Sequence, residues 1–226
     1  MEKKIKIHLI GIGGIGVSAL AQYYLSKGHT VSGSDLVASE ITDFLKEKGA
    51  AIFIGNTAGN ISDNLDLVIF SPAVKEENQE LAKARALQAF GQKLQVLSYP
   101  EALGELTKKY FTIAISGSHG KSTTTAMIGL ILAKAGLDPM VIVGTKVKEF
   151  GNKNIRIGEG EIMLVRTCQP VGISGSRQGS GAVRQACQGL GGLFFGATID
   201  SGRSHTGNFF RRIRLAACNG HNHESG

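Results

Sequence analysis

The 226-residue sequence predicts an α/β protein whose sheets are built from parallel strands. Three observations predict this fold class. Short apolar runs of strand length alternate with helix-length segments, several of the helical segments end at a glycine, and two glycine-rich loops each follow an apolar run directly. Because parallel neighbours need a crossover, usually a helix, this alternation favours sheets with helices on both faces.

The first part of the chain carries five strand-like runs and three helix-like segments. The run Ile5–Ile10 is rich in β-branched residues and stops at Gly11, which is typical of a buried parallel strand. The helix that follows ends at Gly28, and the next one ends at Gly49. We therefore expect one parallel-sheet domain over residues 1–106, with further strands at 30–34, 51–54, 66–70 and 94–97 and a third helix at 77–90.

The same pattern begins again after residue 106. A strand is expected at 111–115, a glycine-containing loop at 116–121 and a helix at 121–135, which Gly136 closes. Further strands are expected at 140–143 and 162–165. Residues 107–165 therefore predict the beginning of a second domain, of the P-loop type.

The first glycine loop reads Gly-Ile-Gly-Gly-Ile-Gly over residues 11–16 and matches G-x-G-x-x-G between a strand and a helix. Such glycines let the backbone turn tightly and approach a diphosphate at the helix N-terminus. Asp35 ends the second expected strand, about 20 residues on, where an acid holds a ribose hydroxyl. This loop alone favours a nicotinamide or flavin enzyme; the alternative is a glycine-rich turn without a ligand.

The second glycine loop also lies between an expected strand and an expected helix. It supplies backbone N–H groups for phosphate oxygens, Lys121 for the β and γ phosphates, and a hydroxyl at Ser122 or Thr123 for Mg²⁺. A standard P-loop has glycine at position 115, where this chain has Ile115, so the loop is a shortened form. The alternative is a Ser/Thr-rich helix start preceded by a turn.

The two loops together resemble the Mur ligases of peptidoglycan synthesis, and the details resemble the alanine-adding branch of that family. The resemblance covers residues 1 to about 165. It is carried by the following segments: His8–Gly16, Gly33-Ser34-Asp35, Ser71-Pro72-Ala73-Val74, and the loop Ser116–Thr125 with its His119.

The resemblance implies a Rossmann-like first domain that binds a UDP-sugar rather than NAD, followed by a central ATP-binding domain. It implies that L-alanine is joined to UDP-N-acetylmuramate through an acyl phosphate, with ATP and Mg²⁺ as cofactors. Lys121 is the implied catalytic residue, and Ser122 lies near the metal. The implied UDP-sugar ligands are Gly11, Gly13, Gly14, Gly16, Asp35 and Ser71, and the implied ATP ligands are Gly117, Ser118, His119, Gly120, Lys121, Ser122 and Thr123.

The resemblance stops after the strand at 162–165. The family places there an acid that helps to bind Mg²⁺, whereas this chain continues Arg166-Thr167-Cys168-Gln169. A cation at that place repels Mg²⁺ rather than coordinating it. The motifs that the family carries later in the sequence are also missing, so we expect a truncated and inactive form of the enzyme.

Residue usage changes at the same point. Residues 1–161 contain 16 Lys and 2 Arg against 16 acidic residues, whereas residues 162–226 contain 7 Arg, no Lys and 2 acidic residues. The second segment also holds 12 of the 31 Gly and all three Cys. We expect residues 166–226 to be an irregular, Gly/Arg-rich tail, either disordered or the product of a shifted reading frame; a divergent natural tail is the alternative.

The net charge of +7 is therefore not a signal for a nucleic-acid partner, because most of it lies in the tail. The spacing of the three Cys fits neither a zinc site nor a disulfide framework, and no apolar stretch approaches bilayer-spanning length. A cytoplasmic protein with no membrane partner is expected, of unknown oligomeric state. Three other functions stay open: a ligase that attaches a recycled tripeptide to the same UDP-sugar, an NAD-dependent oxidoreductase, and a noncatalytic nucleotide-sugar binding module.

Overall fold

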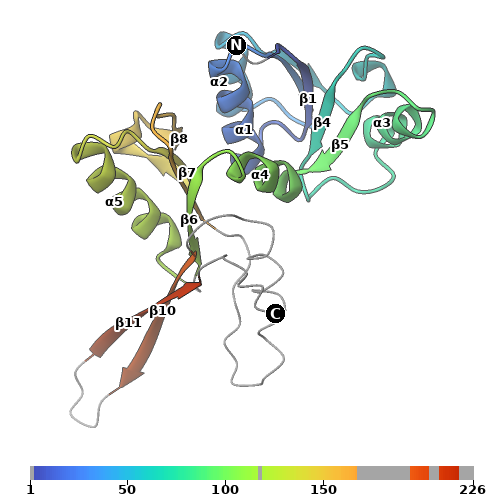
Figure 1. The fold of residues 1–226 in the computed structure, drawn as a ribbon. Helices are drawn as coiled ribbons and strands as arrows, with labels where there is room; N and C mark the ends of the chain where they lie inside the picture. The colour runs from blue at the N-terminus through green and yellow to red at the C-terminus, as the bar shows by residue number, and fades with distance from the viewer. Residues whose placement is uncertain (1–2, 117–118, 167–193, 204–208, 219–226) are drawn as a thin grey trace, which may run out of the picture. The chain divides into compact units, whose positions relative to one another are not determined.

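The computed structural model describes residues 3–116, 119–166, 194–203 and 209–218. The chain divides into two compact units, Met1–Leu103 and Gly104–Gly226, which are described separately (Figure 1). No helix in the described ranges is long and apolar enough to cross a membrane.

The first unit is built on a five-stranded sheet in which every pair of neighbouring strands is parallel. Its strand order is β3-β2-β1-β4-β5, so the order reverses between β1 and β4, where ligands of open α/β sheets bind. The prediction of a parallel-sheet α/β domain is therefore confirmed. Its elements are β1 (Lys6–Ile10), α1 (Ile15–Ser26), β2 (Thr30–Asp35), α2 (Glu40–Glu47), β3 (Ala51–Ile54), η1 (Ala58–Asn60), β4 (Leu67–Phe70), α3 (Gln79–Ala89), β5 (Gln95–Ser98) and α4 (Tyr99–Thr107).

Local sequence explains where the helices of this unit begin and end. Helix α2 begins with a capping box, in which the Ser39 hydroxyl accepts from Thr42 N and the Thr42 hydroxyl accepts from Ser39 N. The Asn78 side chain caps α3 by accepting from two amides of its first turn. Helix α1 is followed by Gly28, whose φ of +77° favours glycine.

The core of the first unit lies around β1, of which four residues are buried, as the mostly apolar run predicts. On α1, Val17, Leu20 and Ala21 are buried at helical spacing. This burial fixes the end of β1 and the start of α1, and therefore the loop between them.

The second unit contains a six-stranded sheet of order β11-β10-β6-β9-β7-β8. Strands β6, β9 and β7 are parallel, and β8 is an antiparallel edge strand that the sequence did not predict. Helix α5 packs closely on β7, because a Cβ at Gly129 would lie 2.7 Å from a methyl carbon of Val141. The elements before the tail are β6 (Phe111–Ser116), α5 (Lys121–Lys134), β7 (Met140–Val147), η2 (Lys148–Phe150), β8 (Lys153–Arg156) and β9 (Ile162–Arg166).

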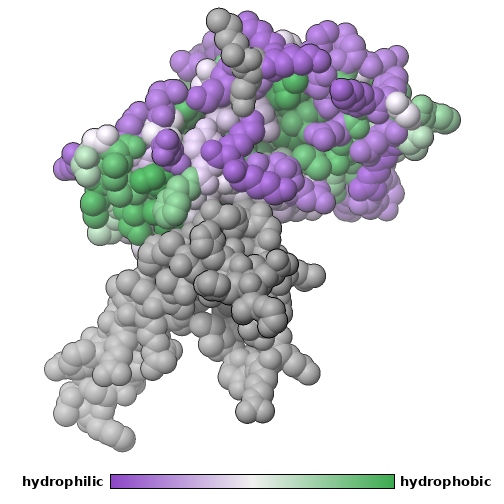
Figure 2. Space-filling view, viewed as in Figure 1, coloured by the Kyte–Doolittle hydropathy of each residue, from purple (hydrophilic) through white to green (hydrophobic). Residues whose placement is uncertain are grey.

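Figure 2 shows apolar surface over α5. The side chains of Met127 and Ile131, one helical turn apart on α5, are 57% and 63% exposed. An apolar outer face on a surface helix is typical of a surface that contacts another segment or protein.

The tail differs from the expectation of an irregular segment. It contains two ten-residue strands, β10 (Phe194–Arg203) and β11 (Phe209–Cys218), which pair antiparallel along their whole length. Residues 194–196 of β10 also pair in parallel with residues 114–116 of β6. Both strands begin with two phenylalanines, a residue type that favours strands, and the average composition of the tail concealed these short runs. Residues 167–193, 204–208 and 219–226 lie outside the described residues, so the expectation of an irregular tail stays a prediction there.

Candidate functional site

The first glycine loop folds back onto the end of β2. The amides of Gly11 and Ile12 both donate to the carbonyl oxygen of Ser34, at 2.8 and 3.0 Å. Gly11 has a φ of +77°, and its carbonyl oxygen accepts from Gly14 N at 3.0 Å. The loop is therefore a tight turn whose main chain is held at the carboxyl edge of the sheet, beside the point where the strand order reverses.

Asp35 holds this turn through one carboxylate oxygen, while the other oxygen is bonded to the next residue of its own segment. Oδ2 accepts from Gly13 N at 2.8 Å, and Oδ1 accepts from Leu36 N at 2.8 Å. A carboxylate oxygen can accept more than one hydrogen bond, so these contacts are compatible with a ribose ligand. What the geometry assigns to Asp35 directly is the shape of the loop.

The structure brings the sequence-predicted residues of this site together. A Cβ at Gly13 would lie 2.8 Å from Asp35 Oδ2, and one at Gly11 would lie 2.9 Å from the Cβ of Ser71, which follows β4. Gly14 is the N-cap of α1, which has no side-chain cap and no acidic residue in its first turn. The N-terminus of such a helix favours an anion.

Tyr99 also belongs to this site, and sequence reasoning missed it. A Cβ at Gly16 would lie 2.7 Å from Cζ of the Tyr99 ring, so glycine is needed where α1 passes the start of α4. The sequence offered no signal for this contact, because Tyr99 begins a helix that contains a proline and a glycine and was not predicted.

The second glycine loop leads from β6 into α5. Gly120 is the N-cap of α5, with a φ of +75°, and Lys121 is the first residue of the helix. The first turn of α5 carries no acidic residue, which suits a phosphate ligand. The hydroxyl of the buried Thr125 donates to Lys121 O at 2.7 Å, which places it in the helix rather than in the site. His119, Ser122 and Thr123 flank this start, whereas Gly117 and Ser118 lie outside the described residues.

The described residues beside this loop do not fit Mg²⁺. Arg166 ends β9 in register with Ile115, next to the last residue of β6, and its guanidinium lies against Gly144 on β7. A guanidinium offers no lone pair to a metal, and Mg²⁺ in proteins is held by carboxylates and waters. Within the described ranges, no group of three or more His, Cys, Asp or Glu residues could hold a metal. No step of phosphoryl transfer is therefore assigned to Mg²⁺.

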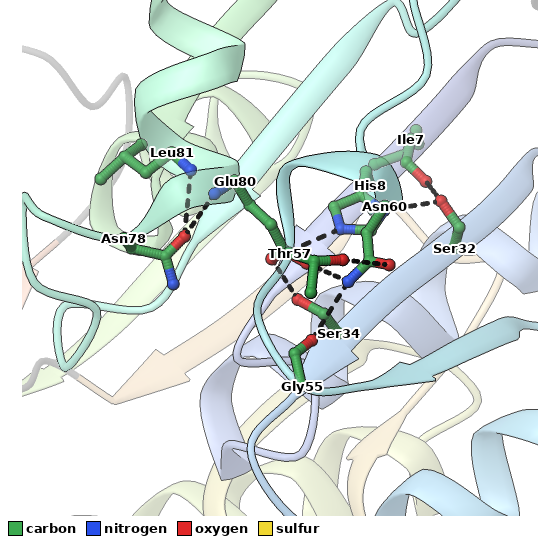
Figure 3. Close-up of polar contacts among 10 residues, drawn as sticks. All are labelled: Ile7, His8, Ser32, Ser34, Gly55, Thr57, Asn60, Asn78, Glu80 and Leu81. Atoms are coloured by element: carbon green, nitrogen blue, oxygen red, sulfur yellow. Dashed lines mark hydrogen bonds and ion pairs between the residues drawn. The ribbon is translucent and has the colours of Figure 1, made fainter.

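A buried polar network lies under the first glycine loop (Figure 3). It joins His8 of β1, Ser32 and Ser34 of β2, Asn60 of η1 and Glu80 of α3. The side chains of His8 and Glu80 are 0% exposed. Sequence reasoning missed this network; the one available signal was the polar His8 inside an otherwise apolar buried strand.

The Glu80 carboxylate is ionised within this network. Burial raises the pKa of Glu80, but nearby His8 and the hydrogen bonds from Ser34 and Asn60 outweigh burial and hold that pKa below its ordinary value of 4.5. Ser34 Oγ donates to Oε2 at 2.5 Å, and Asn60 Nδ2 donates to Oε1 at 2.5 Å. Nε2 of His8 lies 3.9 Å from Oε2.

The lowered pKa predicts a pH dependence of stability. The folded state binds the Glu80 proton more weakly than the unfolded state does, so the contribution of Glu80 is complete above its unfolded pKa and is lost as the pH falls through the lower, folded pKa. The free energy of unfolding of the native chain should therefore approach that of Glu80→Gln as the solution is acidified through the carboxyl range. Urea unfolding of both proteins at several pH values checks this. A constant difference in unfolding free energy across that range contradicts it.

Comparison with known proteins shows which family the chain is similar to. Residues 6–111 match the family model described as Mur ligase family, catalytic domain. Among curated proteins, the UDP-N-acetylmuramate–L-alanine ligase of Clostridium kluyveri is 42% identical over 168 residues, which is 74% of this chain and 35% of the relative. The corresponding ligase of Acetivibrio thermocellus is 45% identical over 166 residues, 73% of this chain and 34% of the relative. The chain thus spans about a third of the length of these relatives.

Solved structures share the fold. The UDP-N-acetylmuramate-alanine ligase MurC of Thermotoga maritima superposes with a TM-score of 0.66 at 24% identity, covering 96% of this chain and 58% of that one. A murein peptide ligase of Psychrobacter arcticus gives a TM-score of 0.62 at 25% identity, covering 72% of this chain and 37% of that one. Together with the order of the two glycine loops, these similarities confirm the expected resemblance. The N-terminal three quarters of this chain therefore belong to the Mur ligase family.

Proposed function

We propose that this chain is the nucleotide-binding portion of an ATP-dependent ligase that joins L-alanine to UDP-N-acetylmuramate. The main support is the pairing of two loops: a glycine turn held by Asp35 at the switch point of one sheet, and a Gly-Lys-Ser helix start after a strand of the next. The curated relatives described above carry that activity in their names, at 42% and 45% identity.

In this proposal the first loop holds the diphosphate of the UDP-sugar. The amides around Gly14, Ile15 and Gly16 open α1, and the positive end of that helix favours the negative charge of a diphosphate. Asp35 fixes the turn and offers its remaining lone pairs to the ribose. Ser71 directly follows the neighbouring strand β4, and its amide donates to Ile10 O at the end of β1.

Lys121 is the proposed catalytic residue for phosphoryl transfer. The γ-phosphoryl group passes from ATP to the muramate carboxylate, which breaks the bond from the γ-phosphorus to the bridging oxygen and releases ADP. The alanine amine then attacks the acyl phosphate, forms the amide and expels inorganic phosphate. A cation at the start of α5 stabilises the charge that the transferred group develops.

We also propose that the 226-residue chain does not complete this reaction by itself. Arg166 stands where the metal acid is expected, and the chain spans about a third of the relatives' length. A tail produced by a shifted reading frame accounts for both the change in composition and the loss of the motif. Translating the coding DNA after codon 161 in the other two frames tests this. If neither frame contains a metal-acid motif followed by a long continuation, the shifted reading frame is rejected.

The experiment that tests the function is ligand binding by the purified chain. Isothermal titration should detect binding of UDP-N-acetylmuramate and no binding of NAD, because the relatives of the chain are named as UDP-N-acetylmuramate–L-alanine ligases. Gly13→Ala should weaken binding of the UDP-sugar by about tenfold or more, since the new methyl group displaces the Asp35 carboxylate.

Gly104→Ala is the matched control, because a Cβ there meets nothing within 4 Å. Its UDP-sugar affinity should equal that of the native chain. Binding of NAD in preference to the UDP-sugar would instead favour the oxidoreductase and reject the proposal. Binding of the free tripeptide in preference to L-alanine would favour the other ligase of the same family.

A further inference from the structure

Glu80 is a buried acid for which the ligation chemistry has no use. Its side chain is 0% exposed, and it reaches no substrate-facing surface. Burying an ionised carboxylate is unfavourable unless its oxygens are fully hydrogen-bonded, and well-packed apolar residues often replace buried ionic groups without loss of stability. Its contacts therefore suggest a role other than the overall stability of the fold.

One oxygen of Glu80 is connected to the start of the glycine turn. Ser34 Oγ donates to Oε2 at 2.5 Å, and the carbonyl oxygen of the same Ser34 accepts from the amides of Gly11 and Ile12. The hydrogen bond to Glu80 fixes the Ser34 side chain, and with it the position of the residue whose carbonyl holds the turn.

The other oxygen is connected to Asp35. Asn60 Nδ2 donates to Oε1 at 2.5 Å and also to Gly55 O at 3.1 Å, while Gly55 N donates to the carbonyl oxygen of Asp35 at 2.8 Å. The Asp35 carboxylate in turn accepts from Gly13 N. Two separate chains of hydrogen bonds thus run from one carboxylate to three consecutive residues of the turn. Figure 3 shows their first links, from Glu80 to Ser34 and from Glu80 through Asn60 to Gly55.

His8 lies behind the same carboxylate. His8 Nδ1 and Ser32 Oγ are hydrogen-bonded at 2.9 Å, and Ser32 Oγ lies 3.3 Å from Ile7 O. Nε2 of His8 is then left facing Oε2 of Glu80, and it has no hydrogen-bond partner in the described part of the chain. His8 therefore lies on the buried side of the network, next to the oxygen that Ser34 contacts.

We propose that Glu80 is a positioning residue for the diphosphate of the UDP-sugar. Through Ser34 and Asn60 it fixes Gly11, Ile12 and Gly13, whose own amides are bonded to Ser34 O and Asp35 Oδ2, and it thereby holds the turn that leads into the ligand-binding start of α1. This inference rests on the proposed function of the first loop. It adds Glu80, a residue of α3 that lies outside both glycine-loop motifs.

Glu80→Gln tests the proposal on the whole 226-residue chain. The variant keeps the shape of the side chain but removes its charge. Because Asn60 Nδ2 can only donate, the Gln amide NH₂ faces Ser34, whose hydroxyl must then accept instead of donating to a charged oxygen, so the connection to Ser34 is weakened. We expect the affinity for UDP-N-acetylmuramate to fall by about tenfold, as for other residues that orient a ligand-binding group from behind. We also expect the backbone amide signals of Gly11, Ile12 and Gly13 to shift in an NMR spectrum.

Glu77→Gln is the matched control. It removes the same charge from an exposed residue three positions earlier, in the turn before α3. Its affinity for the UDP-sugar and its three amide signals should equal those of the native chain. Equal changes in both variants would attribute the effect to net charge and overturn the proposal.

Ser34→Ala keeps the test decisive if Glu80→Gln does not fold. It removes only the donor to Oε2 and leaves the carbonyl that holds the turn, so the same amide signals should shift and the affinity should fall. The fold-loss of UDP-sugar affinity in the double variant should be smaller than the product of the two single fold-losses, because both substitutions affect the same hydrogen bond between Ser34 and Glu80.

The outcomes for Glu80 and for the proposed function are separable. A native chain that binds the UDP-sugar, with Glu80→Gln binding equally well, overturns the positioning role and leaves the function intact. A native chain that binds no UDP-sugar rejects the function; the amide signals, which need no ligand, then decide whether Glu80 braces the turn. Unchanged amide signals in both Glu80→Gln and Ser34→Ala overturn the proposal in either case.

Discussion

Gly33→Ala is expected to lower the free energy of unfolding of the chain by roughly 2–3 kcal/mol, the cost of overpacking a site that cannot relax. Gly33 lies in β2, paired with Leu9 of β1. A Cβ there would lie 2.6 Å from the carbonyl oxygen of Leu9 and 2.5 Å from Cδ1 of Ile12. The Leu9 carbonyl belongs to the backbone of β1 at the centre of the sheet, so a strand has to move to make room for the new methyl group.

Thermal unfolding followed by circular dichroism measures this effect, which should lower Tm by about 10–20 °C for a unit of this size. Gly104→Ala is the matched control: the same methyl group is added within helix α4 and meets nothing within 4 Å. Alanine favours a helix over glycine, so this control should leave Tm unchanged or raise it slightly. A Gly33→Ala variant as stable as the Gly104→Ala control contradicts the predicted overpacking.

The first glycine loop and Asp35 could be predicted from the sequence because their signals are local. The buried run before Gly11, the turn of glycines and the acid at the end of the next strand are local signals, each of them short and independent of tertiary contacts. In the structure, Asp35 reaches back over 22 positions to Gly13, as its place at the end of β2 implies. Strand β3 has the predicted bounds, 51–54, for the same reason.

The network behind the site could not be predicted in this way. Ser34 and Glu80 are 46 positions apart, and Asn60 and Glu80 are 20 apart. Nothing in the sequence around Glu80 distinguishes it from the exposed glutamates before it. Its role depends on how α3 packs against the sheet, which is a tertiary contact without a local pattern.

The unpredicted edge elements have a similar cause. Strand β8 has the sequence Lys-Asn-Ile-Arg, with a single apolar residue in four positions, which is too short for a period to be counted. It exists because β7 offers it an antiparallel partner. The strands of the tail likewise depend on pairing with β6 and with each other, and composition averaged over the tail contains no information about pairing.

The second large expected effect is on turnover: the purified 226-residue chain should release no phosphate in response to L-alanine. Phosphoryl transfer to a carboxylate depends on positive charge that is placed on the transferred group, for which the family uses a metal. Arg166 occupies the strand end beside the second loop, where its guanidinium cannot act as a metal ligand. The alignment with the relative from Clostridium kluyveri covers 35% of that enzyme.

A coupled phosphate assay with ATP, UDP-N-acetylmuramate and Mg²⁺, in the presence and absence of L-alanine, measures this directly. The Acetivibrio thermocellus relative serves as the positive control under the same conditions. Binding of the UDP-sugar by the same preparation shows that the first unit is folded, so a missing signal is then assigned to the second unit rather than to a denatured sample. Alanine-dependent phosphate release by the chain alone would mean that Arg166 and the tail support catalysis, and it would overturn the interpretation of both as replacements of catalytic parts.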